Sequence, residues 1–161
     1  LAAQLGSDVP FCLWGGTSLA TGRGEVLTPL PDFDGHGVVL ANPPLQVSTA
    51  WVYGNYRRPT GDRRRDIHVL RRSIEQQDFL AVADTLFNDL ETVTVPAYPQ
   101  VADIKAQLLQ AGAAGVLMSG SGPTVFALTP DSGAAAELAG RTALGADVAV
   151  FIAETVAREE M

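Results

Sequence analysis

The sequence predicts an α+β fold in which an antiparallel sheet carries helices on one face and is preceded by a separate β-hairpin. The first observation is the order of apolar patterns from Val38 onward: strand, helices, strand, strand, helix, strand. That order is found in the split βαβ unit of ferredoxin-like folds. The second observation is a glycine-rich link, residues 119–123, between the two adjacent strands.

The start of the chain does not fit this order. Residues 1–6, LAAQLG, indicate the last turns of a helix that Gly6 ends in a left-handed conformation. Because the chain begins with Leu1 rather than Met, we expect an N-terminal portion of the protein to be missing. Residues 10–30 are predicted to be β structure with glycine turns, beginning with the apolar run 10–13. This hairpin finds no partner strands in the chain, so we expect it to belong to a different unit.

The elements from residue 38 onward follow from apolar spacing and from the residues that end each segment. Residues 38–40 predict a short buried strand, which Asn42-Pro43-Pro44 ends. Ser48 or Thr49 can cap the helix that follows, which runs through Tyr56. The remaining expected elements are helices over 66–77 and 79–87, a helical stripe over 101–109 that Gly112 ends, strands at 116–118 and 124–128, an Ala-rich helix over 131–142 and a closing strand at 148–152.

The composition argues against several classes of protein. Apolar residues make up 47% of the chain, enough for a core, yet no apolar run approaches the roughly 20 residues of a membrane span. One cysteine, Cys12, and two histidines cannot form a Cys/His metal cluster. The net charge of −7 argues against general affinity for nucleic acid. We therefore expect a cytoplasmic enzyme.

The basic residues are unevenly placed. Most of the 11 basic residues fall in one short stretch: Arg57, Arg58, Arg63, Arg64, Arg65, Arg71 and Arg72. Such a run is usually solvated surface, and the alternative is a patch that attracts an anionic substrate.

Two segments carry candidate chemistry. Gly120 and Gly122 permit positive φ and leave backbone N–H groups unobstructed, a geometry suited to phosphate oxygens, although a tight turn between strands is the simpler interpretation. Asp8 stands between a helix end and the apolar run 10–13, where it can cap a turn. Alternatively, its carboxylate can take the proton of an alcohol substrate or orient the attacking oxygen in phosphoryl transfer.

Together these segments resemble the GHMP kinases, and within that class they look most like the diphosphocytidyl-methylerythritol kinases. The resemblance covers essentially the whole chain and rests on four stretches: LGSDVPF at 5–11, GGTSLATGRGE at 15–25, NDLE at 88–91 and MSGSGPTVFA at 118–127. It implies that residues 1–37 are a remnant of the N-terminal GHMP kinase domain and that residues 38–161 are the C-terminal domain.

The resemblance also implies roles for single residues. Asp8 matches the catalytic aspartate of the class, and Gly120, Ser121 and Gly122 match a loop at the phosphate end of the active site. Thr49 and Tyr53 resemble a polar residue and an aromatic residue that lie near the cytidine. The simpler interpretation of this pair, a capping threonine and an amphipathic-helix tyrosine, stays open.

The implied reaction is ATP-dependent phosphorylation of the 2-hydroxyl of 4-diphosphocytidyl-2-C-methyl-D-erythritol in non-mevalonate isoprenoid biosynthesis, with Mg²⁺ as cofactor. The chain departs from the class because it lacks the Pro- and Gly-rich phosphate loop and the lysine near the chain start. Its only lysine is Lys105. We therefore expect this portion alone to be inactive. Another GHMP kinase with a different alcohol substrate and a non-catalytic ferredoxin-like binding module remain as alternatives.

Overall fold

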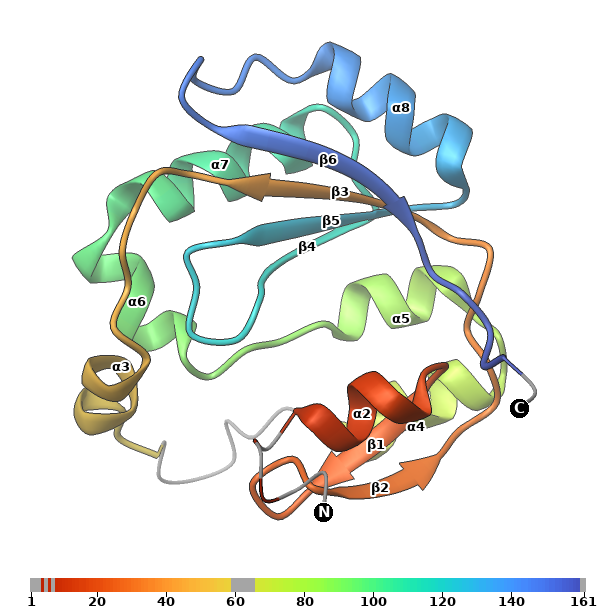
Figure 1. The fold of residues 1–161 in the computed structure, drawn as a ribbon. Helices are drawn as coiled ribbons and strands as arrows, with labels where there is room; N and C mark the ends of the chain where they lie inside the picture. Colours follow the sequence, from red (N-terminus) through yellow and green to blue (C-terminus); the bar gives the residue numbers. More distant parts are fainter. Residues whose placement is uncertain (1–3, 5, 7, 59–65, 160–161) are drawn as a thin grey trace.

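The structure is a computed structural model that describes residues 4, 6, 8–58 and 66–159 (Figure 1). Its elements, in chain order, are α2 (Val9–Trp14), β1 (Ser18–Thr21), β2 (Val26–Pro29), β3 (Gly37–Asn42), α3 (Thr49–Asn55), α4 (Ile67–Glu75), α5 (Phe79–Thr85), α6 (Glu91–Ala97), α7 (Pro99–Gln110), β4 (Gly115–Met118), β5 (Val125–Thr129), α8 (Ser132–Arg141) and β6 (Ala149–Glu154).

A four-stranded antiparallel sheet forms the centre of the molecule. The strand order is β4-β5-β3-β6, so the first and last strands of this unit lie side by side. Val39 faces Ala127 on β5 and Ile152 on β6. The glycine-rich link joins β4 to β5, as the sequence predicted. The predicted α+β class with its antiparallel sheet is confirmed.

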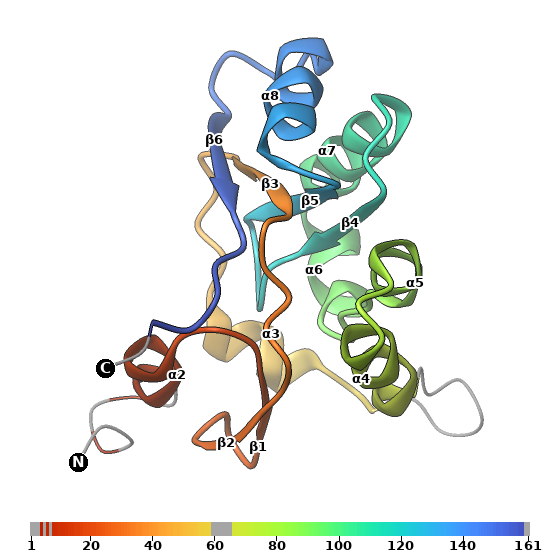
Figure 2. The ribbon, with the colours of Figure 1, turned by 90° about the vertical axis from the view of Figure 1, so that its right-hand side faces the viewer.

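Alternate residues of the central strands form the main core. Val39, Ala41, Val125 and Ala127 are buried on one face of the sheet, where Leu108 of α7 packs with them. Figure 2 shows α7 and α8 on this side of the sheet. Apolar residues of period two on the strands therefore meet the helical stripe of α7, which is the packing that the sequence pattern indicated.

Part of the other face is covered as well. Leu128 of β5 lies in a second core cluster with Phe33 and with Val82 of α5. Leu70 and Ile74 of α4 are among the partly buried residues that pack against that cluster. The helices α4 and α5 therefore close the end of the sheet near β4 (Figure 2).

The beginning of the chain differs from expectation in two ways. Residues 10–13 are helical within α2 rather than β structure. A short apolar run does not distinguish a strand from a helix, and Pro10 fits the first turn of a helix, where its missing N–H would be unpaired anyway. Gly6 does not have the positive φ that a left-handed terminator requires, whereas Gly15 has φ 69° at the end of α2.

The predicted hairpin is present as β1 and β2, a separate two-stranded sheet. Phe11, Leu13 and Trp14 of the preceding α2 are exposed, as expected for apolar groups without a covering layer. The ring of Trp14 packs against Arg158, whose guanidinium carbon lies 3.6 Å from the ring centroid. Within the described ranges, no helix is both long and apolar enough to cross a membrane.

Candidate active site

The glycine loop, residues 119–123 between β4 and β5, is a tight backbone turn. The N–H of Ser119 donates to the carbonyl of Thr124 at 2.8 Å, and the N–H of Gly122 donates to the carbonyl of Ser119 at 2.9 Å. Gly120 has φ 55° and Gly122 has φ 85°, so both positions use the positive φ that the sequence suggested.

The two glycines face different surroundings. A Cβ added at Gly120 would meet no atom within 4 Å, whereas one at Gly122 would lie 2.7 Å from the sulfur of Met118. In the part of the chain that the structure describes, the N–H groups of Gly120 and Ser121 have no hydrogen-bond partner. Two adjacent N–H groups on an open side can hold an anionic oxygen.

The helix α3 brings Thr49 to this loop. Ser48 is the N-cap of α3 and its side chain accepts from the N–H of Trp51 at 3.3 Å, so Thr49 is not needed as the cap. The hydroxyl of Thr49 instead lies 2.9 Å from the hydroxyl of Ser121. Two predicted site residues that are far apart in the sequence are therefore in direct contact.

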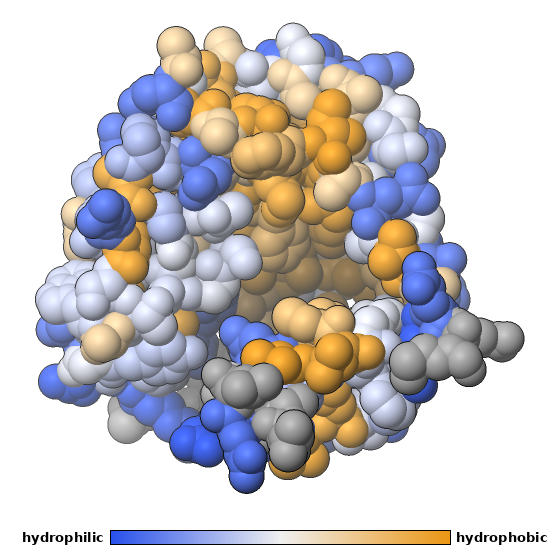
Figure 3. All heavy atoms as spheres, in the orientation of Figure 1, coloured by the Kyte–Doolittle hydropathy of each residue, from blue (hydrophilic) through white to orange (hydrophobic). Residues whose placement is uncertain are grey.

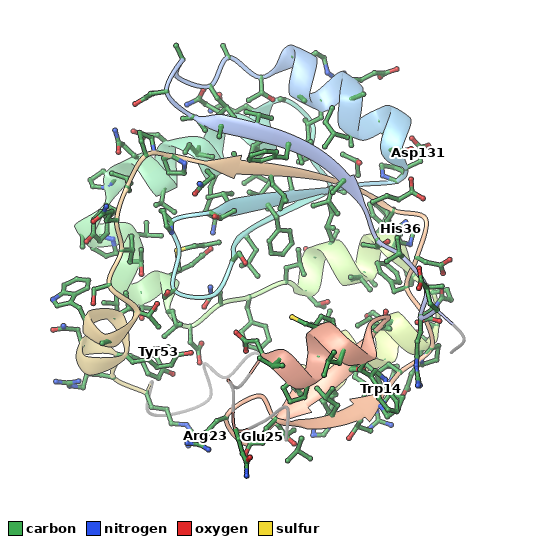
Figure 4. The ribbon with its side chains drawn as sticks, in the orientation of Figure 1. Trp14, Arg23, Glu25, His36, Tyr53 and Asp131 are labelled. Atoms are coloured by element: carbon green, nitrogen blue, oxygen red, sulfur yellow. The ribbon has the colours of Figure 1, made fainter. Side chains whose placement is uncertain are left out.

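Tyr53 lies one helical turn after Thr49 on the same side of α3. Its side chain is 62% exposed, which leaves the ring free to pack against a planar ligand (Figure 4). The neighbouring hydroxyl of Tyr56 donates to Asp89 at 2.9 Å and so ties the end of α3 to the segment before α6.

Asp8 lies at the N-terminal end of α2 and is exposed. Its side chain makes no capping hydrogen bond to α2, so the simple role of a turn cap is not realised. Among the described residues, no hydrogen bond joins Asp8 to the glycine loop. In Figures 1 and 2, α2 lies below the loop between β4 and β5. The structure therefore joins Thr49 to the loop by contact but does not join Asp8 to it.

The basic stretch makes local contacts where it is described. Arg57 donates to the carbonyls of Gly54 and Tyr56, and Arg71 pairs with Glu75 one turn later on α4. Residues 63–65 of this stretch lie outside the described residues. Both contacts fit a solvated surface.

Sequence reasoning missed the residues that hold the loop from behind. Asn88 and the buried Thr94 donate from their side chains to carbonyls of the loop. Glu91 accepts from the N–H of Met118 at 2.8 Å and pairs with Lys105. The NDLE stretch had indicated a resemblance, but no local pattern showed which atoms its side chains would contact.

The described residues contain groups that can bind an anion. The free N–H groups of the loop and the hydroxyl of Ser121 can hold phosphate oxygens. No group of three or more His, Cys, Asp or Glu that could hold a metal ion occurs within the described ranges.

Comparison with known proteins shows which proteins the chain is similar to. Residues 70–141 match the family described as GHMP kinases C terminal. A 4-diphosphocytidyl-2-C-methyl-D-erythritol kinase of Gloeobacter violaceus is 51% identical over 137 residues, covering 81% of this chain and 45% of the relative. One of Geobacillus kaustophilus is 52% identical over 128 residues, covering 80% of this chain and 44% of the relative.

Solved structures show the same fold. A crystal structure of a 4-(cytidine 5'-diphospho)-2C-methyl-D-erythritol kinase superposes with a TM-score of 0.75 at 28% identity, covering 94% of this chain and 54% of that one. A homoserine kinase from Cytophaga hutchinsonii superposes with a TM-score of 0.74 at 22% identity, covering 92% of this chain and 50% of that one, and shows the fold alone.

The chain spans a little under half the length of the curated relatives that it matches. The matched stretch contains most of the main core, the segment NDLE and the glycine loop. The chain therefore contains a GHMP kinase C-terminal domain, which is matched over residues 70–141.

Proposed function

We propose that this chain is part of a kinase that transfers the γ-phosphoryl group of ATP to the 2-hydroxyl of 4-diphosphocytidyl-2-C-methyl-D-erythritol, a reaction of non-mevalonate isoprenoid biosynthesis. The proposal rests on the relatives that are named as this kinase, which are 51% and 52% identical to this chain over 81% and 80% of its length. We further propose that residues 1–37 belong to the N-terminal domain of the enzyme and residues 38–161 to its C-terminal domain.

The geometry supports separate roles for the glycine loop and for α3 within the site. The N–H groups of Gly120 and Ser121 would bind phosphate oxygens, and Gly122 gives the loop its turn. Thr49 and Tyr53 would lie beside the cytidine, with the exposed ring of Tyr53 stacked on the base. The 2.9 Å contact between the hydroxyls of Thr49 and Ser121 supports these roles, because a residue proposed for the cytidine then neighbours a residue proposed for the phosphate.

Asp8 would act on the hydroxyl that receives the phosphoryl group. Its exposed carboxylate makes no capping hydrogen bond, so it can accept a proton or a hydrogen bond from a substrate. Phosphoryl transfer requires mainly correct positioning and stabilisation of charge, and the loop amides and Asp8 would supply these.

ATP supplies the phosphoryl group, and Mg²⁺, which the resemblance implies, neutralises phosphate charge in reactions of this class. The free loop amides fit a phosphate, whereas the described residues hold no cluster of three or more carboxylates, histidines or cysteines for the metal. The free and exposed Cys12 suits a reducing compartment, and we propose a cytoplasmic enzyme.

A chimera tests the proposal. In it, this chain replaces the matching part of the Geobacillus kaustophilus relative, and steady-state kinetics are measured with ATP and 4-diphosphocytidyl-2-C-methyl-D-erythritol. We expect turnover, and we expect Asp8→Asn to reduce it by about 10²- to 10⁴-fold, because Asn cannot take a proton. If Asp8 only orients the hydroxyl, the loss lies near or below the lower end of that range.

The same chemical change at Asp84, an exposed position of α5 whose side chain has no hydrogen-bond partner in the described part of the chain, is the control. Asp84→Asn should leave turnover unchanged. A folded chimera that phosphorylates L-homoserine but not the diphosphocytidyl substrate would overturn the proposed substrate. A folded chimera without activity on any alcohol would favour a non-catalytic binding module.

A further inference from the structure

The side chain of Asn88 is bound to the back of the glycine loop. Its amide group donates one hydrogen to the carbonyl of Met118 at 2.8 Å and the other to the carbonyl of Gly120 at 2.7 Å. Its oxygen accepts from the N–H of Leu90 at 2.9 Å. A rotated amide would place its oxygen against two carbonyl oxygens, so only this orientation satisfies the site.

A second side chain holds the next carbonyl. Thr94 is fully buried in α6, and its hydroxyl donates to the carbonyl of Ser121 at 3.1 Å. The carbonyls of Met118, Gly120 and Ser121 are therefore all held from the same segment, residues 88–94, which leads into α6.

Peptide geometry links the carbonyl of Gly120, which Asn88 binds, to the N–H of Ser121 on the opposite side of the loop. In a trans peptide unit the C=O of one residue and the N–H of the next point in opposite directions. Holding the carbonyl of Gly120 inward therefore turns the N–H of Ser121 outward. That N–H has no partner in the described part of the chain, and the space beside Gly120 is open.

We infer that Asn88 is a positioning residue, which binds the carbonyl of Gly120 so that the N–H of Ser121 faces the open side and can donate to a phosphate oxygen. The inference rests on the proposed function, in which this loop binds phosphate. It adds a residue that acts through the loop and touches no ligand. The affinity for an anion then depends on the fraction of molecules whose loop has this orientation.

The variant Asn88→Asp tests the inference, because it preserves the size of the side chain and replaces the donor by an oxygen that repels both carbonyls. The probe is inorganic pyrophosphate, titrated onto the ¹⁵N-labelled chain while the amide proton shifts of Gly120 and Ser121 are recorded. We expect saturable shifts at both amides in the wild type. In the variant we expect an affinity about tenfold lower, as for a loop that is competent about a tenth of the time.

The control is Asn42→Asp, which adds the same charge beside the same loop. The oxygen of Asn42 only accepts, from the hydroxyl of Thr124 at 3.1 Å, so a carboxylate keeps that bond. The added charge alone should lower the affinity equally in both variants. Only the excess loss in Asn88→Asp reports on positioning, and an affinity equal to that of Asn42→Asp would overturn the inference.

A second variant and the wild-type titration distinguish failure of the inference from failure of the proposed function. If Asn88→Asp does not fold, Asn88→Ser removes both amide donors without adding charge. In this variant we expect pyrophosphate to bind about threefold more weakly, and we expect the amide proton shift of Ser121 to differ from the wild type even without pyrophosphate. Wild-type affinity in Asn88→Ser would also overturn the inference. If pyrophosphate moves neither amide in the wild type, the phosphate role of the loop in the proposed function fails, and the inference fails with it.

Discussion

Glu91 stabilises three elements through one carboxylate. It accepts from the N–H of Met118 at the end of β4 and pairs with Lys105 on α7, with both side chains 20% exposed. Glu91→Gln keeps an acceptor for Met118 but leaves the ammonium of Lys105 without its counter-charge. We expect a loss of about 1–2 kcal/mol in the free energy of unfolding, measured by urea denaturation.

The exposed pair on α4 is the matched control. Arg71 and Glu75 form an ion pair whose side chains are 46% and 38% exposed. Because water screens such pairs, Glu75→Gln should cost less than about 0.5 kcal/mol. Equal losses in the two variants would mean that partial burial does not strengthen the pair at Glu91.

Glu25 provides a pH-dependent contact at the tip of the hairpin. Its own backbone N–H and that of Arg23 lower the pKa of the Glu25 carboxyl, and the N–H of Arg23 donates to it at 2.6 Å (Figure 4). A lowered pKa means that the contact is complete above the unfolded pKa and is lost as the pH falls through the folded pKa. In an NMR titration, Glu25 should titrate at lower pH in the folded chain than in urea, and the Arg23 amide shift should follow it.

At the scale of elements, the turn between β4 and β5 makes different demands on its two glycines. Both have positive φ, so an alanine costs about 1–2 kcal/mol at either position. At Gly122 the new Cβ would also meet the sulfur of the buried Met118 at 2.7 Å, and crowding of this kind adds about 1–3 kcal/mol. Urea denaturation should therefore show a larger loss for Gly122→Ala than for Gly120→Ala, and the reverse order would contradict the described packing.

The elements that local patterns predicted well are those with one clear period. The strands β3 and β5 and the helix α7 pack as their apolar spacing indicated. The helix α6 was not predicted, because its sequence ETVTVPA contains a run of β-branched residues and Pro96, which are poor helix formers. Its helical state depends on tertiary contacts, including the burial of Thr94.

The candidate site shows the same limit. The glycine loop could be predicted because positive φ is a property of single residues. The bonds from Asn88 to Met118 and Gly120 span 30 and 32 residues, so no local pattern contains them. The same holds for Thr49 and Ser121, which are 72 residues apart and meet only because α3 is placed next to the loop.

At the scale of the whole molecule, strand β6 is an exposed sheet edge. Val150, Phe151 and Ile152 are exposed, with Phe151 at 57%, and Figure 3 shows apolar side chains gathered over β6 above a hollow in the surface. Below β6, a groove of about 450 Å³ lies between α2 and the residues that follow this strand. Unpaired apolar edges promote association between chains.

We therefore expect self-association that increases with concentration. Sedimentation velocity should detect it, and Phe151→Lys should reduce it, because a charge on an edge strand opposes pairing. Leu80→Lys on α5 is the control, since Leu80 is also apolar and exposed but does not lie in a strand. A wild-type chain that stays monomeric at all concentrations would contradict this expectation.

The contact between Thr49 and Ser121 limits how many hydrogen bonds the two hydroxyls can donate to a ligand. Each hydroxyl carries one hydrogen, and either oxygen can be the donor across their 2.9 Å contact. While that contact holds, one hydrogen is used between the two residues and only one points outward. When the hydroxyl of Ser121 donates a hydrogen bond to a ligand oxygen, the hydroxyl of Thr49 must donate to Ser121. When Thr49 donates to the ligand instead, Ser121 must donate to Thr49. The two hydroxyls thus act as a single reversible donor, which serves the loop side or the α3 side of a bound molecule but not both at once.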